Sequence, residues 1–209
     1  MKRILFCTIA LILSYSAYSQ PQETYKGWKK GELDIHFIYT GRGEATLYIF
    51  PDGTSMLVDA GDHQASVPMT YPKPDLSRRG GEWVARYIER VNPAGDEVDY
   101  MMLSHFHNDH SGSVSLNVPT TKGRTPDYKL VGIADVGESI IFGNFIDRGF
   151  PNYNYPTAIN DPHISNYKNF VSWQKQQYGA KQEAFKVGAV NQIKLQIWVN
   201  YLLYTSKPG

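Results

Sequence analysis

The sequence predicts an α/β fold (α+β in some schemes), and three features of its first half support this prediction. Alternating apolar residues between positions 33 and 59 indicate short strands joined by tight turns. A segment with helical periodicity, 81–91, follows a long proline-rich loop. The run 98–103 is apolar almost throughout, as expected of a central strand covered on both sides. Strand, loop, helix and strand in this order are typical of an α/β sheet.

The first three strands are predicted from alternation and from turn residues. Residues 33–39 alternate apolar and other side chains, and the glycines of the "GRG" turn at 41–43 lead into a second strand, 45–50. The sequence Pro-Asp-Gly at 51–53 is a tight turn that leads to a third strand, 55–59. No helix follows the "GRG" turn, so a turn is predicted there and not a phosphate-binding loop.

Four further elements are predicted along the chain. The helix at 81–91 places an apolar face inward, made of Trp83, Val84, Tyr87, Ile88 and Val91. A strand is predicted at 129–134. A second helix begins at Asp161-Pro162, which suits an N-cap followed by proline at the first helical position, and continues to Gly179. The tail, 191–209, offers one more strand.

The amino terminus has the pattern of a secretory signal peptide. Lys2 and Arg3 precede an uncharged apolar run at 4–13, and Ala17-Tyr18-Ser19 forms an A-x-S cleavage site. The run is too short to span a bilayer as a helix, although an anchor or a buried core helix is the alternative interpretation. We therefore predict export to the periplasm or the extracellular space and no membrane span after cleavage. Residues 20–32 then form a lead-in to one domain, 33–209.

The composition of the mature chain excludes some kinds of metal site and of binding partner. Cys7, the only cysteine, leaves with the signal peptide, so thiolate metal ligands and disulfides are excluded. Loss of Lys2 and Arg3 from 21 basic residues leaves 19 against 20 acidic residues. No basic surplus indicates tight binding to nucleic-acid phosphates. The sequence gives no indication of the oligomeric state.

The stretch "SHFHNDHSG", 104–112, holds three of the six histidines of the chain directly after the apolar run. On an irregular turn, His105 and His107 can bind one ion through imidazole nitrogen, and Asp109 and His110 can face a second position. These donors suit zinc, with manganese or iron as alternatives. Two such ions about 3.5–4 Å apart can activate a water and polarise a substrate oxygen.

A serine hydrolase is the competing chemical interpretation of this stretch. Ser111 and Ser113 lie beside Asp109 and His110 in the sequence. Neighbours in sequence seldom form a catalytic triad, however, and the chain has no G-x-S-x-G motif. Metal binding is therefore the favoured hypothesis.

Together with the preceding "TGRGEATLYIFPDGTSMLVDAGD", the motif "HFHNDH" resembles the metallo-β-lactamase superfamily, especially its ComEC-like (competence-channel) branch. The resemblance covers about residues 33–112. It implies an αββα sandwich and a two-zinc hydrolytic site with His105, His107, Asp109 and His110 as ligands. It further implies that Asp109 is catalytic and that Asp59 is a buried residue supporting the ligand loop. Small-molecule or phosphodiester substrates, including nucleotides, are the partners that it implies.

The chain departs from the family pattern after His110. The family uses a later histidine, a bridging aspartate and a final histidine, for which only His163 and Asp135 are candidates here. We therefore expect only the amino-terminal half to two-thirds of the sandwich to be present; an intact but divergent domain is the alternative. Two functions remain: a secreted metal-dependent hydrolase, or a catalytically impaired fragment that binds metal weakly or has a structural or interaction role.

Overall fold

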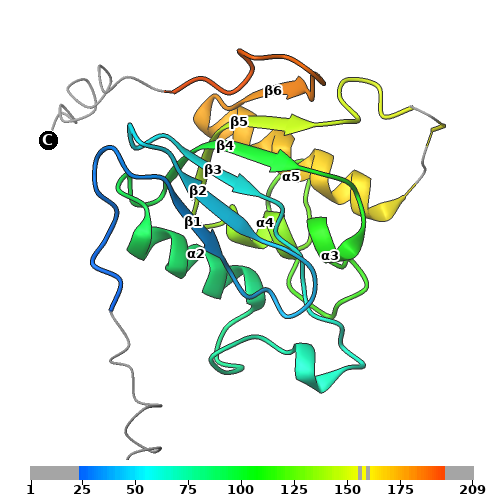
Figure 1. Ribbon diagram of the computed structural model, residues 1–209. Coiled ribbons are helices and arrows are strands. Elements are labelled where there is room, and N and C mark those ends of the chain that lie inside the picture. Colours follow the sequence, from blue (N-terminus) through cyan, green and yellow to red (C-terminus); the bar gives the residue numbers. More distant parts are fainter. Residues whose placement is uncertain (1–23, 155–156, 159–160, 196–209) are drawn as a thin grey trace, which may run out of the picture.

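A six-stranded sheet forms the centre of the computed structural model, which describes residues 24–154, 157–158 and 161–195 (Figure 1). The first three strands pair antiparallel, and the third to the sixth pair parallel. The predicted α/β class is confirmed at this level. The strands lie side by side in chain order: β1 (Asp34–Phe37), β2 (Thr46–Ile49), β3 (Ser55–Val58), β4 (Glu97–Leu103), β5 (Ile141–Asp147) and β6 (Lys181–Ala184).

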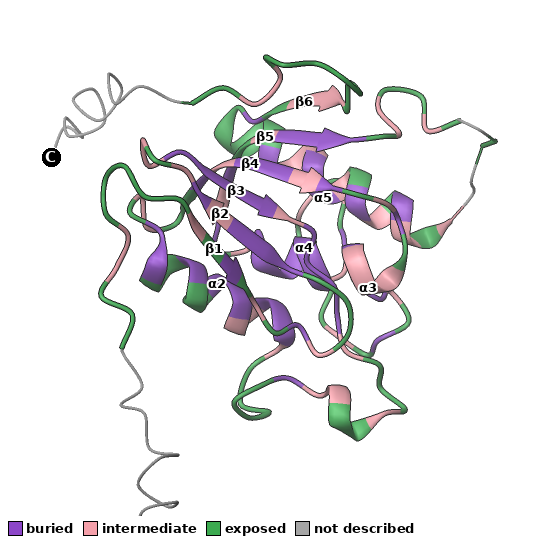
Figure 2. Cartoon of the chain, viewed as in Figure 1, coloured by how far each residue is buried: buried purple, intermediate pink, exposed green. Residues whose placement is uncertain are grey.

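Three helices cover one face of the sheet: α2 (Gly80–Val91), α4 (Gly132–Val136) and α5 (Pro162–Tyr178) (Figure 1). Their buried side chains and those of the strands form one apolar core, which includes Leu57, Ile88, Met101, Phe145 and Phe170. The middle strands, β2 to β5, are mostly buried (Figure 2). A one-turn helix, α3 (Asn108–Ser111), follows β4, and a short 3-10 turn (Pro68–Thr70) lies in the proline-rich loop.

Most elements predicted in the first half are present. The strands predicted at 33–39, 45–50, 55–59 and 98–103 appear as β1 to β4, each with small differences at the ends. The helix predicted at 81–91 is α2, and it buries Val84, Ile88 and Val91. Tyr87, predicted on that face, is 39% exposed. Its hydroxyl instead contacts Nδ1 of His36, at 3.1 Å.

The long helix of the second half is also confirmed. Asp161 is the N-cap of α5 and accepts a hydrogen bond from the backbone N–H of His163, at 2.8 Å. Proline follows at the first helical position, where the missing N–H would have no partner within the helix. Gly179 ends the helix in the left-handed conformation that glycine adopts without steric cost.

The strand predicted at 129–134 is wrong. Lys129 makes only an isolated bridge with Thr120, and α4 begins at Gly132. Gly132 has a φ of 46° and lies so close to Gly112 that a Cβ would approach the Cα of Gly112 to 2.4 Å. This turn allows the chain to leave the extended conformation. It follows Leu130 and Val131, two apolar residues that locally resemble a strand.

Besides α4 and the short 3-10 turn, three elements were not predicted: α3, β5 and β6. In the tail, residues 191–195 contain no strand, and the remainder of the segment lies outside the described residues. The predicted signal peptide, 1–19, lies outside them too. Within the described part of the chain, no helix combines the length and apolar character needed to cross a membrane.

Candidate metal centre

The candidate centre lies where two parallel strands end side by side. Residues of β3 and β4 are paired in parallel, so Asp59 and the histidine cluster emerge at the same edge of the sheet. The backbone N–H of Asp59 donates to the carbonyl of Met102, and that of Ala60 donates to the carbonyl of His110, both at 2.9 Å. These two bonds fix the loop after β3 against the loop after β4.

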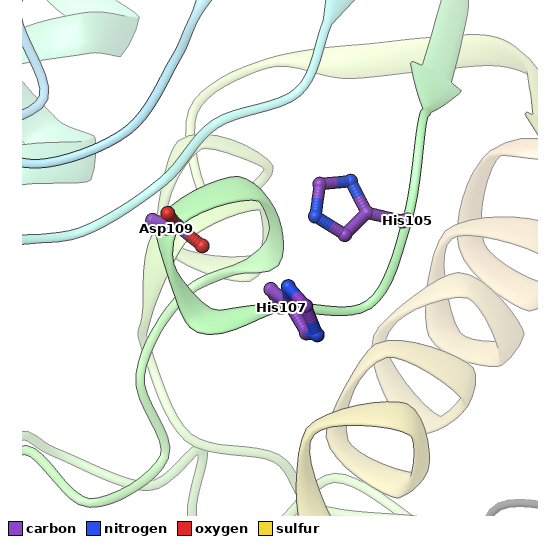
Figure 3. A group of neighbouring side chains, drawn as sticks. All are labelled: His105, His107 and Asp109. Carbon is purple, nitrogen blue, oxygen red and sulfur yellow. The ribbon is translucent and has the colours of Figure 1, made fainter.

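The cluster itself is part extended and part helical. His105 and His107 lie on the extended stretch after β4, and His107 is the N-cap of α3. Asp109 and His110 lie within that single turn, which ends at Gly112. Because the turn reverses the chain, ligand atoms of His105, His107 and Asp109 come within 4.8 Å of one another. Figure 3 shows these three side chains around a common space.

The ring of His110 lies beside the same group, tilted by 48° relative to that of His105. Its ring centroid lies 4.0 Å from that of His105, and the rings of His105 and His107 are 4.7 Å apart. Burial lowers the pKa of His105, and the neighbouring His110 and His107 lower it further. The neutral form of imidazole, which the lower pKa favours, is the form that binds metal ions.

Asp59 holds both the start of the cluster and its last histidine. The carboxylate is 1% exposed and accepts the backbone N–H and the hydroxyl of Ser104, at 2.7 and 2.6 Å. Its Oδ2 also lies 2.7 Å from Nδ1 of His110. A carboxylate can only accept, so Nδ1 carries the proton and Nε2 of His110 remains available to an ion.

The glycine-rich turn after β1 supports the cluster from its other side. Glu44 donates its backbone N–H to the carbonyl of Asp109 at 3.1 Å and accepts the N–H of Gly61 at 3.0 Å. A Cβ on Gly43 or Gly61 would lie 1.6 or 2.0 Å from the carbonyl oxygen of Asp109. Gly43 in this turn and Gly61 after β3 are therefore required by the close approach of backbone to backbone.

Glu44 is a residue that sequence reasoning missed. Its carboxylate, the Asp59 carboxylate and a ring nitrogen of His110 lie within 4.8 Å of one another, and they form a second group with the donors of a metal site. The oxygens of Asp59 already accept three hydrogen bonds, so we regard Glu44 as the more available carboxylate. It borders a groove of about 360 Å³ lined by Phe37, Ile38, Gly43, Glu44, Ala45, Thr46 and His110.

His163 lies at the start of α5, outside both groups. Its Nδ1 is 2.8 Å from Oδ1 of Asp161, and its Nε2 is buried without a hydrogen-bond partner among the described residues. Burial raises the pKa of Asp161, but hydrogen bonds from His163 and the charges of His163 and His107 lower it overall.

Asp135 is also outside both groups. It is 2% exposed, lies in α4 and forms an ion pair with Arg79, whose Nε and Nη2 are each 2.9 Å from Oδ1. Burial raises the pKa of Asp135 to about 7, although the ion pair with Arg79 acts in the opposite direction. Its carboxylate is therefore committed to the contact between α2 and α4.

Ser111 and Ser113, the serines of the competing interpretation, do not form a triad. The hydroxyl of Ser111 donates to the backbone carbonyl of His107 at 3.0 Å, and the hydroxyls of Ser113 and Ser115 lie 2.8 Å apart. Neither contact involves an imidazole, which a serine nucleophile would need as its base.

Comparison with known proteins adds no family assignment. No protein-family model and no curated protein matches this chain. The residues of the centre and their contacts are therefore the basis for any functional proposal.

Proposed function

We propose that this protein is an exported metal-dependent hydrolase of the metallo-β-lactamase type, acting on a small-molecule or phosphodiester substrate. The observation that carries the proposal is the convergence of His105, His107 and Asp109 at the carboxyl end of β4, with His110 beside them. The motif "HFHNDH" and the glycine-rich turn packed against it support the same function.

The donors fit zinc, with manganese or iron as alternatives. Imidazole nitrogen and carboxylate oxygen are ligands of zinc, and this cluster offers both from one short segment. His105, His107 and Asp109 would hold one ion, and His110 and Glu44 would face a second position. The unpartnered Nε2 of His163 is a further candidate, because a buried polar atom without a partner is unfavourable unless a ligand satisfies it. We do not include Asp135, because Arg79 occupies its carboxylate.

The residues of the chain would orient the reaction. Zinc, when bound, supplies a Lewis acid and lowers the pKa of a coordinated water to about 7. Asp59 keeps the proton of His110 on Nδ1 and so fixes the direction of its Nε2. The carboxylate of Asp109 can accept a proton from the attacking water. The groove beside His110 is open to a substrate, with apolar walls at Phe37 and Ile38 and an acidic group at Glu44.

Metal binding is tested first, by titration of purified protein with zinc against a competing chelator. We expect the double substitution His105→Ala and His107→Ala to abolish the tighter binding event. His63→Ala is the matched control, since His63 pairs with Asp62 and lies outside the cluster. Tight binding that survives the double substitution would show that the cluster is not the site.

Turnover is tested with model phosphodiesters and lactones in the presence of zinc or manganese. We expect hydrolysis that is lost in Asp109→Ala and retained in His63→Ala. Zinc binding through the cluster without hydrolysis of any of these substrates would instead support the catalytically impaired fragment. Hydrolysis that persists in Asp109→Ala would contradict the proposed role of this carboxylate.

The role of His163 can be tested separately. His163→Ala removes the candidate ligand and leaves the carboxylate of the N-cap Asp161 in place. If His163 binds the ion, zinc affinity should fall about 10-fold or more, whereas Asn166→Ala, one turn further along α5, should leave it unchanged. Equal affinities in wild type and His163→Ala would remove His163 from the ligand set.

Export is tested by the intact mass of protein recovered outside the cytoplasm. Cleavage at the A-x-S site should give a chain that begins at Gln20. Recovery there of a chain that retains residues 1–19 would refute this part of the proposal.

A further inference from the structure

The hydroxyl of Ser104 lies between the buried carboxylate of Asp59 and the ring of His105. Its Oγ is 2.6 Å from Oδ2 of Asp59 and 3.0 Å from Nδ1 of His105. Ser104 directly precedes the histidine cluster, and its backbone N–H bonds to Oδ1 of the same aspartate at 2.7 Å. Because the backbone bond fixes the residue against Asp59, its side chain can contact both groups at once.

The direction of these two contacts follows from the single hydrogen of the hydroxyl. An ionised carboxylate can only accept, and a hydroxyl that donates to one lies about 2.5–2.7 Å away, which matches the 2.6 Å contact with Asp59. The hydrogen of Ser104 is therefore directed at Asp59. Toward His105 the hydroxyl can then offer only a lone pair, so Nδ1 of His105 must carry the proton in the 3.0 Å contact.

We propose that Ser104 is a positioning residue, which keeps the proton of His105 on Nδ1 and so leaves Nε2 free to bind a metal ion. Nδ1 is the ring nitrogen nearer the backbone, and Nε2 lies at the far end of the ring. Figure 3 shows the ring of His105 directed away from its backbone toward Asp109. A hydrogen bond to the nitrogen that does not bind the ion is the usual means by which proteins orient a histidine ligand.

Asp59 then orients two histidines by two routes. Its Oδ2 accepts directly from Nδ1 of His110 at 2.7 Å, and it reaches His105 through the hydroxyl of Ser104. The same hydroxyl is 3.5 Å from Nδ1 of His110, for which Asp59 is the nearer acceptor. His105 and His110 belong to the two different groups of candidate ligands. One buried carboxylate therefore sets the proton positions for both groups.

The proton positions can be read by NMR of the two imidazole rings in ¹⁵N-labelled, metal-free protein at about pH 8, where imidazole is neutral. In wild type we expect both rings to carry the proton on Nδ1. In Ser104→Ala, His105 should carry it on Nε2 in a large share of molecules, whereas His110 should be unchanged because its bond to Asp59 remains. Ser104→Thr keeps the hydroxyl and should restore the wild-type pattern. Ser104 is exposed, so the additional methyl group has room.

Zinc affinity, measured against a competing chelator, provides the second test. We expect Ser104→Ala to lower the affinity about 10-fold and Ser104→Thr to stay within about twofold of wild type. Ser55→Ala is the matched control, because the hydroxyl of Ser55 also contacts a carboxylate, that of Asp99 at 3.3 Å, but at the opposite end of β4. It should change neither the proton positions nor the zinc affinity.

This inference rests on the proposed metal centre, but the NMR measurement needs neither metal nor turnover, so the two can fail separately. A proton on Nε2 of His105 in wild type would overturn the role of Ser104 even if zinc binds to the cluster. Equal affinities in wild type and Ser104→Ala, or an equal loss in Ser104→Ala and Ser104→Thr, would overturn it too. Failure of zinc to bind at the cluster would instead contradict the proposed function, and the proton positions would still decide whether Ser104 directs His105.

Discussion

Replacement of Asp59 by asparagine is the most informative single change to the centre. The substitution keeps the size of the side chain and removes its charge. Asp59 has a φ of 57°, in the left-handed region that asparagine tolerates better than most residues. The backbone of the loop should therefore be preserved, so that the effect reports on the contacts of the carboxylate.

The magnitude follows from those contacts. The amide oxygen can still accept the backbone N–H of Ser104, which is 2.7 Å from Asp59 in the native chain. The amide N–H₂ would then face Nδ1 of His110, which must become an acceptor and move its proton to Nε2. A protonated Nε2 cannot bind an ion. We expect zinc affinity to fall about 10- to 100-fold and the free energy of unfolding to fall by about 1–3 kcal/mol.

The assay is a zinc titration against a competing chelator, with urea unfolding of the same metal-free samples. Asp99→Asn is the control, because Asp99 also accepts from one serine, the backbone N–H and hydroxyl of Ser55, but at the opposite end of β4. It should change stability without changing zinc affinity. The reasoning is refuted if zinc affinity in Asp59→Asn stays within about twofold of wild type.

Three further predictions follow from the same contacts. Gly43→Ala should lower the free energy of unfolding by about 2 kcal/mol more than Gly123→Ala, as measured in urea. Both glycines have positive φ, but only at Gly43 would a Cβ meet the backbone of Asp109. Zinc at 100 times its Kd should raise the free energy of unfolding of wild type by about 2.7 kcal/mol. It should leave that of the double variant, His105→Ala with His107→Ala, unchanged. Between pH 4 and pH 7, the free energy of unfolding of wild type in urea should fall by up to about 4 kcal/mol relative to that of Asp135→Asn. Burial raises the folded-state pKa of this acid from 3.8 to about 7, so the folded chain stays protonated to a higher pH than the unfolded chain. Two curves that stay parallel would contradict this prediction.

The sequence predicts the first half of the fold well because local signals agree there with the tertiary environment. β3 and β4 are apolar runs that end in polar residues, and α2 has a clear apolar face. β5 was missed since Gly143 and Asn144 interrupt its apolar pattern. β6 consists of "KQEA", and polar or charged residues are common on the last strand of a sheet, where they discourage further pairing. Neither pattern resembles a strand in isolation.

Only the part of the centre that lies in one short segment could be predicted from the sequence. Four candidate ligands occur in one short segment, and their spacing indicates a metal site directly. Glu44 is about 65 residues earlier in the chain, and it reaches Asp109 only because β2 pairs with β3 and β3 with β4. The glycines beside it were interpreted as a turn. The close approach of Gly43 to Asp109 depends on tertiary contacts that periodicity and composition do not encode.

Two strand-end aspartates show why residue type and position together do not define a ligand. Asp59 and Asp147 both lie at the carboxyl edge of the parallel strands, and both are buried. The carboxylate of Asp147 accepts five hydrogen bonds: from the backbone N–H groups of Gly149 and Phe150, the hydroxyls of Tyr153 and Tyr167, and the amide of Gln182. These donors belong to the loop after β5, to α5 and to β6, so Asp147 joins three elements. Asp59, in contrast, directs one of its contacts to His110 and so to the candidate metal centre. The difference between the two carboxylates is the set of donors that surrounds each of them.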